Sequence, residues 1–193
     1  MSRATIVFAP DPSDGRLLAA ARDVAERRLR DLDHEVTVLD LADFEPVLSA
    51  DERAAYNSDR PLLDDETIAA ADAVGNSQVL VFIYPTVLFT LPPVVKGWLD
   101  RVLVPGVAFT MTTSGHTRRG LRHIDRLVGV STYDTNWWHT RRAGDSGRRI
   151  LARNLRACMR LTTRVRWVPS YNGGHDARSA DSFLGRVERA VAR

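Results

Sequence analysis

Residues 86–91 are the part of the chain whose types and spacing best suit ligand binding. Pro85 ends a run of apolar residues and Pro92-Pro93 opens the next segment, so the stretch between them is a turn held at two rigid points. Such a turn can lie along the edge of a flat heteroaromatic ring, where backbone amides bond ring nitrogens and carbonyls while apolar side chains exclude water. The candidate contacts are Pro85, Thr86, Val87, Leu88 and Phe89.

Other chemistries lack their sequence motifs. The chain has no G-x-G-x-x-G after its first apolar run, no G-x-x-x-x-G-K-[ST], no H-E-x-x-H and no G-x-S-x-G. The single cysteine, Cys158, excludes an intramolecular disulfide and a thiolate metal site. The five histidines are scattered without ligand spacing. We therefore expect no metal site.

Strand-like and helix-like segments alternate along the whole chain. Period-two or continuous apolar patterns predict strands, and apolar residues at helical spacing predict helices. The predicted strands are 5–9, 34–41, 79–84, 124–132 and 164–168. The predicted helices are 15–32, 64–74, 92–103, 146–161 and 179–192. Residues 42–63 form a long connection that either covers a site or partner subunit or makes a plain surface excursion.

This alternation predicts an α/β fold with a parallel sheet and helices on both faces, in one domain spanning residues 1–193. The run at 79–84 is apolar or aromatic throughout, which is typical of a central strand. In the strand order 2-1-3-4-5, a ligand lies beyond the carboxyl ends of the first and third strands. The loops after Ala9 and Tyr84 are therefore the expected site.

The helix predicted at 92–103 contains Gly97, which costs roughly 1 kcal/mol against alanine inside a helix. A glycine there indicates close packing by a neighbouring helix or by a second subunit. Asp100 and Arg101 are interpreted as surface or interface charges.

The basic residues are almost all arginine, since Lys96 is the only lysine among 27 basic side chains. Arg149, Arg153, Arg156 and Arg160 recur at helical spacing and are interpreted as a solvated face opposite an apolar one. A nucleic-acid partner would need a basic face interleaved with aromatics in a recognisable module. The sequence has no such module, so we expect no nucleic-acid partner.

The sequence also predicts no membrane span. Its longest apolar stretch is interrupted by Pro85, Pro92 and Pro93, whereas a membrane helix needs roughly 20 uninterrupted apolar residues. Residues 1–10 lack the apolar core of a secretory signal. Together with the single cysteine, these features predict a cytoplasmic location.

The segment YPTVLFTLPPVVKGWLDRVLVPGVAF, residues 84–109, resembles the flavodoxin-like NAD(P)H quinone oxidoreductases. Members of that family read aromatic-Pro, a short aromatic-rich loop, a Pro-containing turn, then Leu-Lys-Gly-Trp-aliphatic-acidic-Arg-Val, followed by Gly and an aromatic. Residues 34–56 resemble the family more weakly. The resemblance implies a flavodoxin-like three-layer sandwich.

The resemblance also implies an activity and an assembly. Such enzymes bind FMN or FAD, take hydride from NAD(P)H onto flavin N5, and pass two electrons to a quinone or similar electrophilic aromatic acceptor. They are homodimers, which implies a dimer contact through the helix at 92–104. The loop at 85–89 would contact the isoalloxazine ring.

The loop after the first strand departs from the family pattern. Relatives have His-Pro and then Ser-aromatic-Asn, whose groups hold the flavin phosphate at a helix N-terminus. Here the sequence reads APDPSDGRLL, so Asp11 and Asp14 would repel a phosphate unless they are turned away or cap the first helix. The resemblance assigns flavin binding in this loop to Pro10, Ser13, Arg16 and Leu17.

The loop after the fourth predicted strand departs as well. Relatives have Thr-Thr-Gly-Gly there, and Tyr133 and Asp134 occupy the glycine positions of this chain. The resemblance assigns cofactor contacts to Ser131, Thr132, Tyr133 and Asp134, and catalytic assistance to Tyr133 and His139, with Arg141 as another candidate. Trp137 and Trp138 either stack on a nicotinamide or acceptor, or fill a dimer cleft.

These departures keep a second hypothesis open, a catalytically degenerate flavodoxin-like regulatory or binding subunit. A single-electron carrier is disfavoured by the basic composition and the dimer-type helix. The sequence does not distinguish FMN from FAD, NADH from NADPH, or one acceptor from another. Arg118, Arg119 and Arg122 are candidates to meet a 2′-phosphate.

Overall fold

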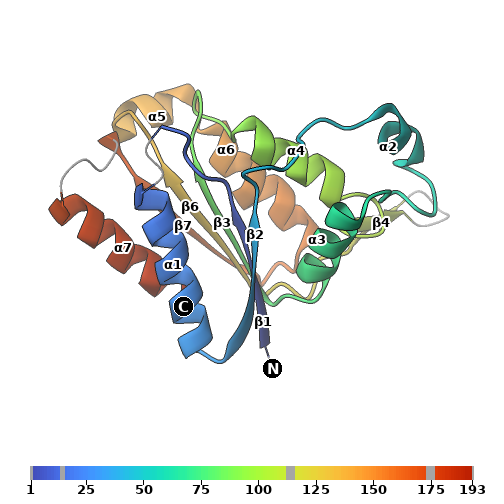
Figure 1. Ribbon diagram of the computed structural model, residues 1–193, viewed down its shortest axis with the longest axis horizontal. Helices are drawn as coiled ribbons and strands as arrows, with labels where there is room; N and C mark the ends of the chain where they lie inside the picture. Colours follow the sequence, from blue (N-terminus) through green and yellow to red (C-terminus); the bar gives the residue numbers. More distant parts are fainter. Residues whose placement is uncertain (1, 14–15, 112–115, 173–176, 193) are drawn as a thin grey trace.

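The computed structural model describes residues 2–13, 16–111, 116–172 and 177–192, and its centre is a five-stranded parallel sheet of order β2-β1-β3-β6-β7 (Figure 1). Counted within the sheet, this is the predicted order 2-1-3-4-5. The strands are β1 (Ser2–Phe8), β2 (His34–Asp40), β3 (Val79–Pro85), β6 (Arg126–Thr132) and β7 (Arg164–Ser170). Every residue of β3 is buried, because helices cover both faces of the central strand.

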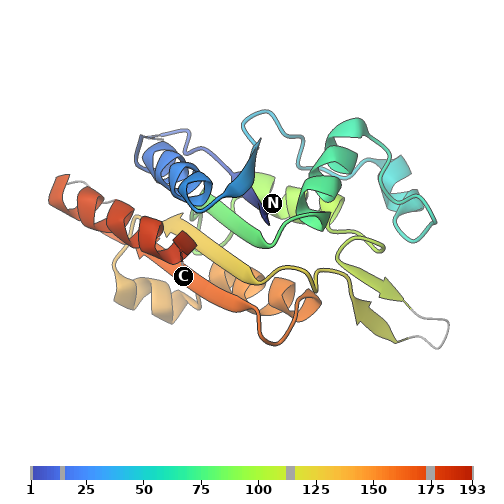
Figure 2. The same ribbon diagram turned by 90° about the horizontal axis from the view of Figure 1, so that it is seen from below.

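Helices form a layer on each face of the sheet, which confirms the three-layer sandwich (Figure 2). Helices α1 (Arg16–Asp31) and α7 (Ala177–Ala192) lie side by side on one face. Helix α1 buries Leu18, Ala21, Ala25 and Leu29, the helical spacing seen in the sequence. The other face is covered by α3 (Asp65–Gly75), α4 (Pro93–Val102) and the segment 146–158.

The helix predicted at 146–161 is shorter and irregular. It consists of α6 (Ser146–Arg149), a π-helical turn (Ile150–Asn154) and a 3₁₀ turn (Leu155–Cys158). Its buried apolar side chains, Leu151 and Leu155, still follow helical spacing. Periodicity located this segment but did not reveal how its hydrogen bonding changes along its length.

Three short features were not predicted. Helix α2 (Ala50–Ala55) lies in the long connection, and its capping box joins Ser49 and Glu52. Helix α5 (Trp137–Ala143) follows β6. Strands β4 (Phe109–Met111) and β5 (Thr117–Arg119) pair in antiparallel fashion beyond α4. Each is too short for its apolar periodicity to be recognised.

Gly97 of α4 packs against the long connection and not against a neighbouring helix, which was one of the two predicted neighbours. A Cβ at this position would lie 2.1 Å from the carbonyl oxygen of Pro46. The close approach predicted from the glycine is confirmed, and it is intramolecular. The connection at 42–63 therefore packs onto α4.

Arg101 is a buried structural charge, which corrects its interpretation as a surface or interface residue. Its side chain is 9% exposed and forms an ion pair of 2.7 Å with Glu52, whose side chain is 10% exposed. It also bonds Asp64 at 3.0 Å and lies over the ring of Phe44. Asp100 instead pairs with the exposed Lys96 one turn earlier. Arg101 thus fastens the long connection to α4.

Within the described part of the chain, no helix is both long enough and apolar enough to cross a membrane.

Candidate functional site

Three loops meet at the carboxyl edge of the sheet, at the switch point between β1 and β3. They follow β1, β3 and β6 and are joined by backbone hydrogen bonds. The amide of Ala9 donates to the carbonyl of Ile83 at 2.9 Å, and the amide of Thr86 donates to the carbonyl of Thr132 at 2.9 Å. The loops expected to form a site are therefore brought together.

The loop after β3 is a tight hairpin turn. Val87 and Thr90 exchange two backbone hydrogen bonds of 3.1 and 2.9 Å. Leu88 and Phe89 between them have φ values of 46° and 61°, the left-handed region that L-residues rarely occupy. Within the described structure, the amides of Leu88 and Phe89 make no hydrogen bond, and Leu88 is 88% exposed. The turn presents two free donors beside an apolar side chain.

Neighbouring elements hold this turn in place. The hydroxyls of Thr86 and Ser131 are 2.5 Å apart. The carbonyl of Phe89 accepts from the amide and the hydroxyl of Ser146, at 3.0 and 3.2 Å. A Cβ on Gly147 would lie 2.9 Å from the Leu91 amide nitrogen, so the start of α6 touches the turn. These contacts stabilise the left-handed backbone and make the loop rigid.

In the loop after β1, a carboxylate of the protein itself occupies the donors that were expected to bind a flavin phosphate. Asp11 accepts hydrogen bonds from the amide and the hydroxyl of Ser13, at 2.8 and 2.6 Å. Asp11 therefore closes the turn that precedes α1, and both Ser13 donors are in use. Pro10 and Leu17 are half-buried and Arg16 is exposed. Asp14 and Gly15 lie outside the described residues.

The third loop turns Tyr133 into the protein. Tyr133 is 2% exposed, its hydroxyl donates to Asp145 at 3.0 Å, and the indole N–H of Trp167 donates to the same hydroxyl at 3.3 Å. Burial, with the nearby Asp145 carboxylate, raises the pKa of Tyr133. Burial also raises the pKa of Asp145 despite its bond from Tyr133. The phenol is therefore a neutral donor within the protein.

His139 and the two tryptophans stand on α5, next to this loop. Asn136 caps the helix by accepting from the His139 amide at 3.0 Å, and the imidazole Nδ1 is 3.1 Å from the same oxygen. His139 and Asp134 are exposed, whereas Ser131 is buried against Thr86. Trp138 is 66% exposed and packs edge-on against Trp137. Exposed aromatic surface thus lies beside an exposed imidazole.

Three further residues at the site, Asp145, Ser146 and Tyr171, were not predicted from the sequence. Asp145 bonds Tyr133, Ser146 bonds the turn after β3, and the Tyr171 ring lies 5.1 Å from that of Tyr133. Asp145 and Ser146 stand at the start of the helix predicted at 146–161. Asp and Ser at such a position are a recognisable helix-start pattern, which could have indicated both residues. No pattern marks Tyr171, which reaches the site only through sheet topology.

No cluster of three potential ligands for a metal ion occurs in the described part of the chain. The site consists instead of backbone donors, apolar side chains and aromatic rings at a sheet switch point. This arrangement defines a doubly wound α/β protein that suits a flat ring ligand. The chain belongs to the flavodoxin-like fold family, whose model matches residues 2–190.

The relatives are oxidoreductases. The chain is 35% identical over 111 residues to the FMN-dependent NADH:quinone oxidoreductase of Vibrio vulnificus (strain YJ016), a match covering 58% of this chain and 51% of that protein. The chain thus spans about half the length of the curated relatives it matches, or less.

Solved structures share the fold over the full chain. An NAD(P)H:quinone oxidoreductase from Methanothermobacter marburgensis superposes with a TM-score of 0.81 at 20% identity, covering 99% of this chain and 98% of that one. An FMN-dependent NADH-azoreductase from Bacillus anthracis str. Ames Ancestor, in complex with FMN, gives 0.76 at 14% identity, covering 100% and 99%.

Proposed function

We propose that this chain is a flavin-dependent NAD(P)H oxidoreductase that passes two electrons to a quinone or a similar electrophilic aromatic acceptor. The observation that carries the proposal is the rigid turn after β3, with two free amides at Leu88 and Phe89 at the sheet switch point. Names of the relatives support the same activity, because they are called FMN-dependent NADH:quinone oxidoreductases.

The residues around the turn fit the ring of a flavin. Pro85 to Phe89 would hold one edge of it, with the free amides donating to ring acceptors and Leu88 excluding water. Bound flavin supplies the chemistry of accepting a hydride and releasing two electrons. We favour FMN as the cofactor, because relatives and one solved neighbour carry FMN in their names.

The phosphate end fits less well. Both Ser13 donors are engaged by Asp11, so a flavin phosphate would have to displace that carboxylate or bind through Arg16 at the start of α1. We therefore expect flavin to bind more weakly than a loop with free donors would allow. Pro10 and Leu17 remain the predicted apolar contacts in this loop.

We propose different roles for the two predicted catalytic residues. His139 is exposed on α5 and can donate a proton to a bound acceptor. Tyr133 is buried and bonded to Asp145, so it would act by positioning the third loop. The exposed faces of Trp137 and Trp138 would stack on the nicotinamide or the acceptor. Ser131, Thr132 and Asp134 remain predicted cofactor contacts.

A homodimer through the helix at 92–104 remains part of the proposal. Helix α4 buries Val95, Trp98 and Val102 in its own core, and Gly97 contacts Pro46. A partner would therefore contact the flanks of that buried face, where Val94 and Leu99 pack against the core but are only partly buried.

One observation favours the second candidate, a binding or regulatory subunit without catalysis. The Asp11–Ser13 contact closes the loop that holds flavin phosphate in the resembled enzymes. Steady-state kinetics distinguish the two candidates. We expect the protein supplied with FMN to oxidise NADH or NADPH in the presence of menadione. Flavin binding with no turnover above free FMN would favour the subunit instead.

A further inference from the structure

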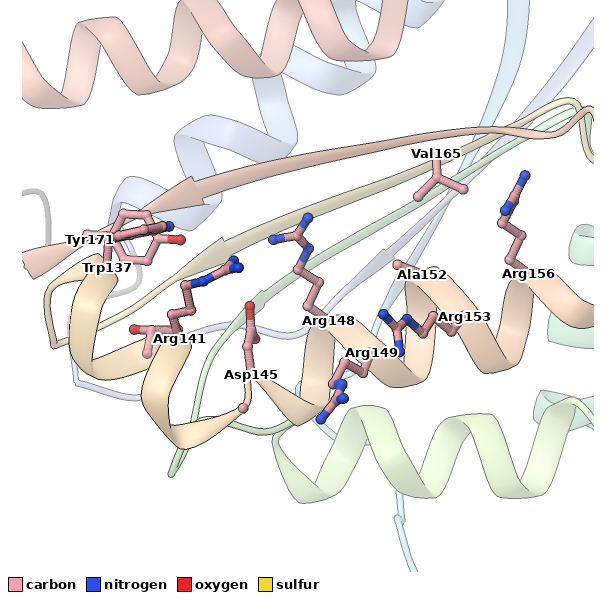
Figure 3. Close-up of a pocket in the computed structure, with 12 residues that line it drawn as sticks. Trp137, Arg141, Asp145, Arg148, Arg149, Ala152, Arg153, Arg156, Val165 and Tyr171 are labelled. Atoms are coloured by element: carbon pink, nitrogen blue, oxygen red, sulfur yellow. The ribbon is translucent and has the colours of Figure 1, made fainter.

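An arginine-lined groove of about 710 Å³ lies between α5, the segment 146–156 and the edge strand β7 (Figure 3). We call it the Arg groove. Its basic residues are Arg141, Arg148, Arg149, Arg153 and Arg156. Arg148, Arg149, Arg153 and Arg156 come from the segment 146–156, and Arg141 comes from α5. Arg149 and Arg153 are exposed as the sequence predicted, whereas Arg156 is half-buried, and all three gather along a concavity that the sequence did not indicate.

The positive charge of the Arg groove is not balanced. Among the described residues that line it, Asp145 is the only carboxylate, and burial raises the pKa of that group. Within the described residues, none of the five arginines forms an ion pair with a carboxylate within 4.0 Å. The buried Nε of Arg156 has no hydrogen-bond partner.

A second groove provides a contrast. It measures about 310 Å³, lies between α1 and α7, and combines Arg27 and Arg28 with Asp31, Asp181 and Glu188. Arginines there are balanced by acidic neighbours. The excess of cations in the Arg groove is therefore a local feature, and it favours an anionic ligand.

One end of the Arg groove joins the candidate site. Trp137 and Tyr171 line that end, as Figure 3 shows, and Asp145 in its wall accepts the hydrogen bond from Tyr133. The next residue, Ser146, donates to the carbonyl of Phe89 in the turn after β3. A ligand whose reactive end lies at the loops can thus extend along the groove.

We propose that the Arg groove binds the phosphates of the nicotinamide donor and selects NADPH over NADH, an inference that rests on the proposed function. Guanidinium groups bind phosphate oxygens in bidentate fashion, and a run of them suits an extended ligand with several phosphates. The pyrophosphate carries about two negative charges and a 2′-phosphate adds about 1.5 to 2 more. The rings of Trp137 and Tyr171, at the end of the groove next to the candidate site, suit contact with the nicotinamide half of the donor. Arg118 and Arg119, on β5 beyond α4, are not part of this groove.

The test is the double substitution Arg149→Ala/Arg153→Ala, with Arg27→Ala/Arg28→Ala as the matched control. Both pairs remove two arginines from grooves on helical surfaces. Three donors are compared with menadione as acceptor: NADPH, NADH, and an N-benzyl dihydronicotinamide that has no phosphate. We expect KM for NADPH to rise roughly tenfold or more in the groove variant, because charge-assisted bonds are lost. KM for NADH should rise less, and turnover of the benzyl donor should not change.

Unchanged KM for NADPH in the groove variant would overturn the proposal. An equal loss with the benzyl donor would also overturn it, because that result indicates a structural effect. The proposal would fail as well if the groove variant lost only the binding of a short single-stranded oligonucleotide. Calorimetric titration with the adenosine bisphosphate fragment of NADPH tests the groove without turnover. If wild type binds this fragment and the groove variant does not, the result supports phosphate binding in the Arg groove, even if wild type oxidises no donor. If wild type does not bind the fragment, the result contradicts the proposal.

Discussion

Asp11 is the residue that most distinguishes the phosphate end of this site. Its carboxylate engages the amide and hydroxyl of Ser13, the donors that a phosphate would use. We predict that Asp11→Ala tightens FMN binding roughly tenfold, because it frees both donors and removes a charge of the same sign as phosphate. Quenching of FMN fluorescence on titration with protein measures the dissociation constant.

Ser13→Ala serves as the comparison, because it removes a donor and keeps the carboxylate. This variant should bind FMN no more tightly than wild type. If Asp11→Ala also leaves the affinity unchanged, FMN phosphate does not bind at the loop after β1.

Asp145 should make the folded state sensitive to pH. Since burial raises its pKa, the native protein holds this proton more tightly than the unfolded chain, and stability falls as pH rises above the ordinary aspartate pKa of about 4. Asparagine tolerates the left-handed backbone at this position, φ 42°, and can still accept from Tyr133. We predict that Asp145→Asn is more stable than wild type at pH 7, by a few degrees in Tm.

The difference between Asp145→Asn and wild type should shrink as the pH is lowered toward and below about 4, where the wild-type carboxyl becomes protonated in both states. Urea unfolding at the two pH values measures it. A variant that is less stable than wild type at pH 7 would show that the Asp145 charge is stabilising.

Residue-level prediction from sequence succeeded where local chemistry constrains the backbone. Pro85, Pro92 and Pro93 made the intervening turn predictable, whereas the positive φ values of Leu88 and Phe89 carried no glycine signal. The inward orientation of Tyr133 was not predictable. It depends on Asp145 and on Trp167 of β7, which topology alone brings near.

At the scale of elements, Arg101 joins α4 to the connection that contains α2. It bonds Glu52, Asp64 and the carbonyl of Glu45 from a nearly buried position. We predict that Arg101→Ala lowers the free energy of unfolding by about 3 kcal/mol, because it leaves a buried carboxylate unpaired. Lys96→Ala, which breaks the exposed pair with Asp100, should cost at most about 0.5 kcal/mol. Denaturant unfolding measures both.

The same ion pairs predict acid sensitivity. Burial alone would raise the pKa of Glu52, but bonds from Ser49 and Arg101 outweigh it and lower the pKa. The ionised Glu52 then contributes its full stabilisation of the folded state above about pH 4.3, the pKa of glutamate in the unfolded chain. This stabilisation is lost as the pH falls through the lower pKa of Glu52 in the folded protein. Arg101→Ala should therefore lose less stability than wild type in that acid range. An equal loss would show that Arg101 does not cause the shift.

Gly97 permits the close contact between α4 and the long connection. We predict that Gly97→Ala destabilises the protein by about 2 kcal/mol or more, because its Cβ would meet the Pro46 backbone. Gly75→Ala, at the end of α3 where a Cβ meets nothing within 4 Å, should be neutral or stabilise by up to about 1 kcal/mol. Thermal unfolding of the two variants compares them. A neutral Gly97→Ala would mean that the connection is not fixed to α4.

Long periodic elements were predictable, because a buried strand or amphipathic helix repeats its signal over several residues. Thus α1 and β3 lie within a few residues of their predicted bounds. The hairpin of β4 and β5 and the capped helix α2 were missed, since pairing and capping stabilise them more than periodicity does.

At the scale of the whole molecule, the parallel sheet places loops from distant parts of the sequence at one edge. The switch point was predictable from the alternation of strands and helices. The Arg groove was not, because it forms between α5, the segment after it and β7, whose relative positions depend on tertiary packing.

We propose that this edge of the sheet holds a flavin that cycles between NAD(P)H and a quinone. The most direct test of this proposal is the visible spectrum of the protein loaded with FMN, recorded without oxygen while NADPH and then menadione are added. We predict that the visible absorption band of the oxidised flavin bleaches with about one equivalent of NADPH and returns with about one equivalent of menadione. Failure to retain FMN, or bound FMN that NADPH does not bleach, would contradict it.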